Sequence, residues 1–201
     1  MCGRFILIPK DELNRIIADV KKNLQAQQHA NVSASYQDVY PKAEVPIIVP
    51  DAGRLEVAVM KWGYERSWSK VPLFNTRADT ATGKKGNMWE GSLEHRRCII
   101  PSYGFYEPHK TDTHPSPKTG KPIKDQYYFH LPNSDILLMA GVYEDGHFSI
   151  MTTEPNRWMR DIHPRMPVVL RPDEVDTWLG ESYSTLFDRS NIELTAQREA
   201  A

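Results

Sequence analysis

The second residue of the chain is a cysteine, Cys2, and this position gives it a chemistry that an internal cysteine lacks. Removal of the initiator Met1, which is usual before a small residue, would make Cys2 the amino terminus. Its α-amine, with a pKa of about 7.7–8.0, is then substantially neutral at physiological pH. An amine and a thiol on neighbouring carbons can attack an aldehyde in turn, first giving a Schiff base and then a five-membered thiazolidine. Gly3 allows close backbone approach, and Arg4 adds a cation that favours thiol reactivity.

The stretch FNTRADT places an amide, a guanidinium and a carboxylate close together. Asn75 can hold a sugar or carbonyl oxygen, and Arg77 can bind a phosphate through two nitrogens. The stretch is therefore a candidate for binding an oxygen-rich ligand, and the ordinary alternative is a polar turn.

Two more segments offer groups for proton transfer. Glu107 ends a GFYE turn that follows an apolar strand, and aromatic surroundings of this kind raise a carboxyl pKa by desolvation. His163, in DIHPRMP, titrates near neutrality and lies beside Arg165. The alternatives are a surface carboxylate at a strand end and a structural histidine. Dehydration of a carbinolamine needs a proton donor, and Schiff-base formation needs a neutral amine, so a carboxyl and a histidine suit that chemistry.

The elements that must position these residues follow from hydrophobic periodicity. Apolar runs predict strands at Arg4–Ile8, Val45–Val49, Leu55–Trp62, Arg97–Tyr103, Gln126–Leu131, Ile136–Tyr143, Phe148–Thr152 and Val168–Leu170. A helix is predicted from about residue 11 to 27, because apolar residues recur at offsets 0, 3, 4, 7 and 11 from Leu13. Shorter helices are predicted at 87–95, 155–160 and 172–179, and the polar residues 109–124 predict an exposed loop.

Many short strands with a few helices indicate an α+β protein with a curved, mainly antiparallel, barrel-like sheet and flanking helices. The length of 201 residues fits a single domain over residues 1–201. A hydrophobic fraction of 40% and a charged fraction of 25% are typical of a soluble globular protein. A cytoplasmic monomer is expected.

Composition also excludes several classes of function. The formal net charge of -1 excludes nucleic-acid binding by bulk positive charge, although not through a local basic groove. Only Cys2 and Cys98 are present, which argues against a disulfide scaffold or a cysteine-rich zinc site, and no metal or cofactor is expected. No apolar run approaches the roughly 20 residues that a membrane span needs, so no membrane partner is expected.

Five motifs occur together in the order MCGRF, WGY (Trp62–Tyr64), FNTRADT, GFYE and HPRMP. In order and spacing they resemble the SRAP family, the SOS response-associated peptidases, over about residues 1–180. The resemblance implies a DNA damage response protein that captures abasic sites in single-stranded DNA through a covalent thiazolidine on the processed Cys2. It also implies autopeptidase (hydrolase) activity, AP-lyase-like activity and association with the nucleoid on damage.

The resemblance further implies roles for individual residues. Cys2 is the nucleophile, Asn75 contacts the linkage or the sugar, Glu107 transfers protons and His163 assists Schiff-base chemistry and its reversal. The expected DNA contacts are Arg4, Arg77 and Arg165 to phosphates, Thr152 through its backbone, and Trp68 by stacking on a base. This chain departs from the family at Asp38 and Tyr40, where Asn and Ala are usual, and at Ser67, where some members have a second tryptophan.

Three other functions remain open at this stage. A glutaminase domain also begins with MCG, but its further motifs are not found in this sequence. A thiol peptidase acting on other proteins could use Cys2, His163 and Glu107. A non-covalent reader of single-stranded or modified DNA would need only the arginines and Trp68, and its complex would dissociate on denaturation.

Overall fold

Strands dominate the computed structural model, which describes residues 2–21 and 37–199. The strands are β1 (Arg4–Leu7), β2 (Asp38–Val39), β3 (Glu44–Asp51), β4 (Arg54–Trp62), β5 (Asn75–Arg77), β6 (Arg97–Pro115), β7 (Pro122–His130), β8 (Leu137–Glu144), β9 (His147–Thr153), β10 (Met166–Pro167), β11 (Val169–Leu170) and β12 (Thr195–Arg198). The helices are α1 (Lys10–Lys21), α2 (Ala78–Gly83), α3 (Glu90–His95) and α4 (Val175–Leu179), with short 3-10 helices at Pro172–Glu174 and Tyr183–Phe187.

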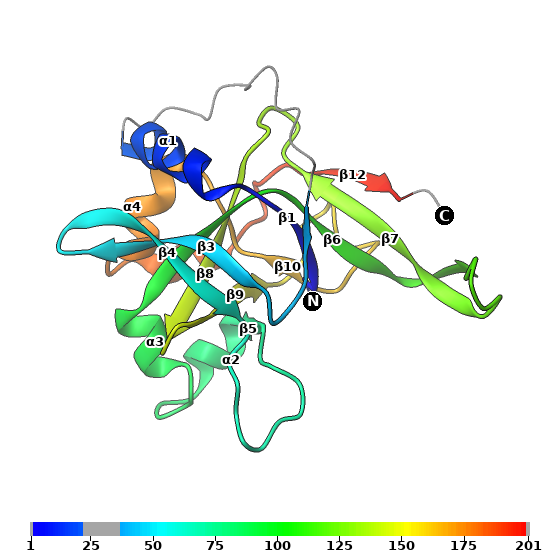
Figure 1. Ribbon diagram of the computed structural model, residues 1–201, viewed down its shortest axis with the longest axis horizontal. Coiled ribbons are helices and arrows are strands. Elements are labelled where there is room, and N and C mark those ends of the chain that lie inside the picture. The colour runs from blue at the N-terminus through cyan, green and yellow to red at the C-terminus, as the bar shows by residue number, and fades with distance from the viewer. Residues whose placement is uncertain (1, 22–36, 200–201) are drawn as a thin grey trace.

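The strands form one curved sheet whose path returns on itself (Figure 1). The order β8–β9–β4–β3–β6 is closed by pairing of β6 with β8, where Ile99 lies opposite Ala140. Most pairs are antiparallel, while β4 and β5 both run parallel to β9. The predicted fold class, α+β with a mainly antiparallel barrel-like sheet, is confirmed in this ring-like form.

Two apolar clusters lie on the two faces of the sheet, as the period-two alternation of strands requires. On β6, Cys98 and Ile100 belong to the cluster that also holds Cys2, whereas Ile99 belongs to the cluster under the helices. The helix α1 buries Leu13, Ile16, Ile17 and Val20 in that second cluster, which confirms its apolar stripe. Leu24 and the rest of the helix predicted up to residue 27 lie outside the described residues. Within the described ranges, no helix is long and apolar enough to cross a membrane.

The helix predicted at residues 155–160 is wrong, because hydrogen-bonded turns occupy this segment. The Asn156 side chain explains the difference. Its Oδ1 accepts a hydrogen bond from the Trp158 N–H at 3.1 Å, while its Nδ2 donates to the carbonyl of Ile192 at 2.7 Å. A buried asparagine used in this way competes with helical hydrogen bonding. The predicted helix at 87–95 is shorter, beginning at Glu90, while 172–179 is helical as predicted.

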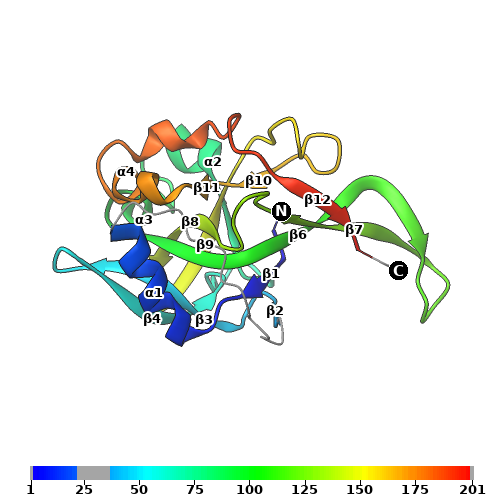
Figure 2. The same cartoon turned by 90° about the horizontal axis from the view of Figure 1, so that it is seen from above.

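Two predictions about the middle of the chain are also wrong. The GFYE residues are not a turn but the centre of β6, which continues to Pro115. The expected loop at 109–124 is the outer part of a β6–β7 hairpin, with Thr113 opposite Lys124 and a shift in register after Pro108. Figures 1 and 2 show this hairpin projecting from the body of the protein. Its polar composition predicted exposure correctly, but strand pairing overrides weak local preference.

Gly104 lets β6 and β7 approach closely just before Glu107. A Cβ at this position would lie 2.5 Å from the Phe129 carbonyl oxygen and 2.4 Å from Cε2 of Tyr128. Gly104→Ala should therefore lower the free energy of unfolding by about 3 kcal/mol, since overpacking against backbone is hard to relieve. Urea denaturation measures this. Gly83→Ala, where a Cβ meets nothing within 4 Å, is the matched control and should be nearly neutral. Equal stability of the two variants would contradict the close approach.

Candidate functional site

Segments far apart in the sequence bring the candidate residues to one end of the sheet. Cys2 precedes β1, whose Arg4 lies opposite Tyr106 on β6, next to Glu107. Asn75 begins β5, which pairs in parallel with β9 so that Arg77 lies opposite Thr152. The loop from β9 to β10 carries His163 and Arg165, and β10 pairs back onto the end of β9. The sheet thus joins four of the recognised motifs in one place.

Cys2 is fully buried, and Asn75 holds its backbone. The Nδ2 of Asn75 donates a hydrogen bond of 2.8 Å to the Cys2 carbonyl, while the Cys2 Sγ lies 3.7 Å from the Arg4 carbonyl. Burial, and then the charge of Glu107, raises the pKa of the Cys2 thiol well above its ordinary value. The thiol is therefore protonated at neutral pH, and it needs a base if it is to act as a nucleophile.

Glu107 is a candidate for this base, and it is fully buried on β6. Desolvation raises the pKa of its carboxyl from 4.5 to about 7. The carboxyl can therefore both give and take a proton near neutral pH. Its Oε2 lies 3.5 Å from Nε2 of His163, so the two candidate proton-transfer groups are neighbours, as their proposed chemistry requires.

His163 is held in one orientation. Its Nδ1 lies 2.8 Å from the Arg165 carbonyl oxygen, which can only accept, and 3.3 Å from the Arg165 N–H. The shorter contact favours the tautomer with the proton on Nδ1 and the Nε2 lone pair toward Glu107. Desolvation lowers the pKa of His163 to about 4. The imidazole is thus neutral at physiological pH, and it accepts hydrogen bonds toward the carboxyl.

Arg165 and Arg77 meet at Asp79. Arg77 binds the Asp79 carboxylate through Nε at 3.1 Å and Nη2 at 2.5 Å, and this hydrogen bonding lowers the pKa of Asp79 to about 2. Arg165 is buried, and it reaches Glu154 at 2.5 Å, Asp79 at 3.3 Å and the Thr152 carbonyl at 3.0 Å. Arg77 and Arg165 thus lie close together, and both are paired with carboxylates of the chain itself.

Arg4 is also paired. Its guanidinium lies 3.5 Å above the Tyr106 ring, donates to Glu199 at 2.5 Å and lies 3.3 Å from Asp38. The departure at Asp38 thus has a structural consequence, because it adds a second carboxylate to this arginine. The Arg4 side chain is thus half-buried among these partners, while Cys2 is fully buried.

Thr152 and Trp68 differ in their relation to this site. Thr152 is buried on β9, and its carbonyl accepts the Arg165 bond described above. Trp68 lies on the segment between β4 and β5, with 68% of its surface exposed. Its indole contacts no other ring within the described part of the chain, so a flat aromatic face is open to solvent.

Buried polar atoms of Asn75 and Arg165 lack hydrogen-bond partners among residues 2–21 and 37–199. These atoms are Oδ1 of Asn75 and Nε of Arg165. A buried unpaired donor or acceptor typically costs about 1–3 kcal/mol. One acceptor and one donor at the same end of the sheet mark a place suited to a polar ligand.

Sequence reasoning missed the carboxylates that pair with the arginines. Asp79 lies two residues after Arg77, inside the FNTRADT motif, and this short spacing was the available signal. Glu154 and Glu199 are distant from their partner arginines in sequence, and no local pattern connects them.

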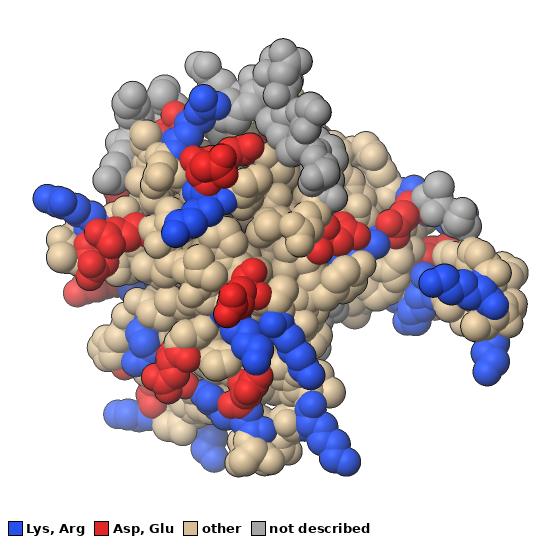
Figure 3. Space-filling model, viewed as in Figure 1, with Lys and Arg blue, Asp and Glu red and all other residues tan. Residues whose placement is uncertain are grey.

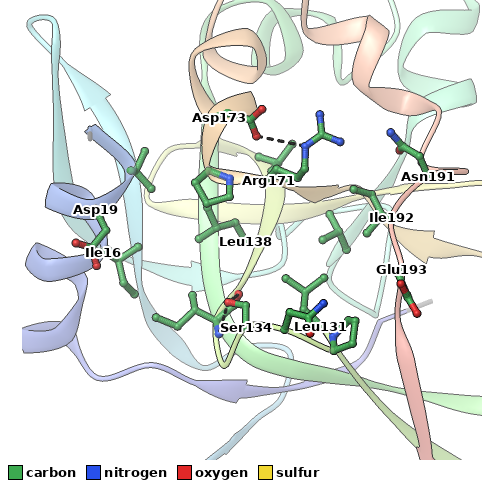
Figure 4. Close-up of a pocket in the computed structure, with 17 residues that line it drawn as sticks. Ile16, Asp19, Leu131, Ser134, Leu138, Arg171, Asp173, Asn191, Ile192 and Glu193 are labelled. Atoms are coloured by element: carbon green, nitrogen blue, oxygen red, sulfur yellow. Dashed lines mark hydrogen bonds and ion pairs between the residues drawn. The ribbon is translucent and has the colours of Figure 1, made fainter. Parts of the chain in front are cut away.

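Neither a metal centre nor the pocket in Figure 4 belongs to this site. Across the described ranges, no group of three His, Cys, Asp or Glu side chains could hold a metal ion. The pocket has a volume of about 520 Å³ and lies between α1, the β7–β8 connection and β11. None of the candidate residues lines it, and its Arg171 is paired with Asp173 (Figure 4).

Comparisons with known proteins show the family of this chain. The family model described as SOS response associated peptidase (SRAP) matches residues 1–199. The Bacillus subtilis protein named abasic site processing protein YoqW is 32% identical over 194 residues, covering 90% of this chain and 80% of that protein. The Escherichia coli abasic site processing protein YedK is 25% identical, covering 92% and 82%.

Solved structures are similar in fold. A phage-related protein from Bordetella bronchiseptica matches with a TM-score of 0.69 at 21% identity, covering 100% of this chain and 95% of the other. A protein from Bacteroides thetaiotaomicron matches with a TM-score of 0.66 at 23% identity, covering 97% and 91%. The family model over nearly the whole chain, together with the 32% identical relative, shows that this protein belongs to the SRAP family.

Proposed function

We propose that this protein processes abasic sites by covalent capture, with Cys2 as the residue that forms the bond. The observation that carries the proposal is the burial of Cys2 beside Asn75 and Glu107, with His163 next to that carboxyl. The names of the relatives support the substrate class. Single-stranded DNA is the expected form, because a flipped-out sugar without a base enters a small site most easily there.

The reaction joins two nucleophilic atoms of one residue to one carbon. After Met1 is removed, the neutral Cys2 amine adds to the aldehyde carbon of the ring-opened deoxyribose, giving a carbinolamine. Glu107, protonated, donates a proton to the departing hydroxyl, and water leaves as the C=N bond forms. Glu107, now ionised, takes the proton of the Cys2 thiol and is restored to its protonated form. The sulfur then adds to the carbon of the C=N bond and closes the ring. The net products are a thiazolidine and one water.

Asn75 and His163 position the reacting groups in this scheme. Asn75 holds the Cys2 carbonyl through Nδ2, which leaves its buried Oδ1 free to accept from the sugar. Neutral His163 supports Glu107 from Nε2. In the reverse direction Glu107 protonates the departing sulfur, and the proton released when water adds to the C=N carbon returns to the Glu107–His163 pair. A histidine that stayed cationic here would instead favour an ionised Glu107, which cannot act as the acid.

Removal of Met1 can use the same groups. The Cys2 sulfur attacks the Met1 carbonyl carbon, the acyl group passes from nitrogen to sulfur, and water cleaves the thioester to release methionine. The Cys2 amine is then free. This route makes the protein its own peptidase, while peptidase activity on other proteins would need a second binding site for them.

Intact-mass spectrometry tests the proposal directly. The protein is incubated with an oligonucleotide that contains one abasic site, and with the same oligonucleotide lacking it. We expect a product of the mass of the chain without Met1 plus the abasic oligonucleotide, less one water. Complete retention of Met1, or no covalent product with the abasic strand, would contradict the proposal.

Asp79 should weaken binding to DNA, since a phosphate must displace it from Arg77. Its low pKa keeps it ionised at neutral pH. Asp79→Asn keeps the shape and removes the charge, so it should raise the non-covalent affinity for a single strand up to about fivefold, the range of an exposed ion pair. Arg77→Ala is the opposite control and should lower affinity and flatten its salt dependence. Titration by fluorescence anisotropy measures both. Weaker binding by Asp79→Asn would mean that Asp79 orients the arginine instead.

A further inference from the structure

The outer part of the β6–β7 hairpin, residues 109–124, has a composition that the site described above does not explain. We call it the lysine arm. It carries Lys110, Lys118, Lys121 and Lys124 against Asp112, a formal charge of +3 in a chain whose net charge is -1. The rest of the chain is therefore clearly acidic. Figure 3 shows basic side chains gathered at the outer end of the arm.

The lysine arm is nearly all exposed, and it is held by backbone pairing. His114 lies opposite Ile123, and the Ser116 N–H donates to the Lys121 carbonyl at 2.8 Å. A two-stranded ribbon without a buried face adds little to stability, so its length serves something other than the core. Ile123 is its one large exposed apolar side chain among the described residues. Such a surface suits a polyanion better than an apolar protein partner.

The four lysines differ from the site arginines in one respect. No carboxylate of the described residues lies within ion-pair distance of any of their ammonium groups. Lys110 and Lys124 donate to backbone carbonyls, which leaves their charge uncompensated. Arg4, Arg77 and Arg165 all hold carboxylates. The arm is thus the better-exposed source of positive charge.

The arm begins at the proposed capture site. It continues the strand that carries Glu107, and the Lys110 N–H donates to the Ile162 carbonyl at 2.7 Å, one residue before His163. The nine residues from Glu107 to Pro115 make eight steps and reach about 25 Å at the rise of an extended strand. At about 3.4 Å per nucleotide of a stacked strand, this reach covers roughly seven nucleotides.

We propose that the lysine arm is a second DNA-binding element, which binds phosphates of the strand flanking the nucleotide at Cys2. This inference rests on the proposed function for its substrate. On this proposal, the affinity of the protein for DNA depends on the length of the flanking strand, whereas the covalent step does not depend on the arm.

The test compares two triple variants with the same change in charge. Lys118→Ala/Lys121→Ala/Lys124→Ala removes three charges from the arm. The control removes three exposed charges from α1 and the start of β4, as Lys10→Ala/Arg15→Ala/Arg54→Ala. Each protein binds undamaged single strands of about 5 and about 25 nucleotides over a series of salt concentrations, with anisotropy as the readout. Covalent capture of an abasic strand is measured separately by mass at saturating protein.

The arm variant should bind the long strand about 10-fold more weakly, with a salt slope lower by about 2, which is what three lost phosphate contacts predict. The short strand and the control variant should show changes of less than about twofold. An equal loss of affinity for the short and the long strand, or an equal loss in the arm variant and the control variant, would contradict the proposal that the arm binds the flanking strand. If wild type captures no abasic strand, the proposed function fails, but the anisotropy still decides whether the arm binds DNA.

Discussion

Replacing Cys2 with alanine should remove every denaturation-resistant complex with abasic DNA, while non-covalent affinity for the same strand changes by less than about threefold, under about 1 kcal/mol. The reason is that the Cys2 side chain is fully buried, so its replacement removes the atom that forms the bond and no exposed positive charge. Denaturing gels after incubation with an abasic oligonucleotide measure the first quantity, and anisotropy measures the second. The two together separate capture from binding.

The Ala variant lacks the sulfur proposed to remove Met1, so it is prepared with residue 2 as its amino terminus, checked by intact mass, and this gives a sharper test. Its amine can still form a Schiff base, so borohydride should restore a stable complex by reducing the C=N bond. Cys2→Ser should behave in the same way, because oxygen closes the five-membered ring less favourably than sulfur. Cys98→Ala is the matched control, since Cys98 is equally buried but internal, and it should capture like wild type. A gel-stable complex of Cys2→Ala without borohydride would assign the bond to another residue.

The fold was predictable where hydrophobic periodicity alone decides it. The apolar stripe on α1 depends on neighbours in sequence and was located correctly, and the strand predicted at Leu55–Trp62 is present as β4. β5 was not predicted as a strand, because FNTRADT has no apolar alternation. Its strand conformation comes from parallel pairing of Asn75 with Ile150, a partner 75 residues away in the sequence. The lysine arm was predicted as a loop for the same reason. Its polar residues have little strand preference of their own, and the backbone pairing of β6 with β7 makes them a hairpin.

The candidate site shows the same division. Cys2, Asn75, Glu107 and His163 could be named because each lies in a short motif. Their mutual arrangement, with Glu107 and His163 3.5 Å apart, could not be, since 56 residues separate them. The carboxylates that pair with Arg4 and Arg165 were not predicted, because they are also distant from these arginines in sequence. Glu199 reaches Arg4 across nearly the entire chain, through the pairing of β12 with β7.

Glu107→Gln should slow covalent capture by about 100-fold to 10,000-fold, the usual contribution of a positioned acid or base. Glutamine keeps the size of the side chain but can neither donate a proton to the departing hydroxyl nor accept one from the thiol. Single-turnover rates at saturating protein measure the effect. Wild type should show a bell-shaped profile with its maximum near pH 7.5, because capture needs protonated Glu107, with a pKa of about 7, and a neutral amine, with a pKa of about 8. The capture rate of the variant should only rise with pH, as the amine loses its proton.

Two controls separate this effect from others. Glu154→Gln removes a carboxylate at the same end of the sheet, on Arg165, and should leave the capture rate within about threefold. Intact mass must show that Glu107→Gln has lost Met1, since a retained methionine blocks the amine. If Met1 is retained only in this variant, Glu107 is assigned to self-processing, and the capture rate is then measured on protein made with an exposed Cys2.

The same substitution should stabilise the protein at neutral and higher pH. The folded pKa of Glu107, about 7, lies above its unfolded value near 4.5, so the folded state holds an extra proton between these pH values. The free energy of unfolding of wild type therefore falls as pH rises from 4.5 to 7, by about 3 kcal/mol for this group. His163, whose folded pKa is lowered to about 4, acts in the opposite direction as pH falls below 6.5, but it does so in both proteins.

The difference between Glu107→Gln and wild type isolates the carboxyl. We expect it to be near zero at pH 4 and to reach about 3 kcal/mol in favour of the variant at pH 8, measured by urea denaturation at both pH values. A difference independent of pH would mean that burial does not perturb this carboxyl. A slower enzyme that is also more stable would show that the fold tolerates the cost of burying Glu107 because the reaction at Cys2 needs its proton.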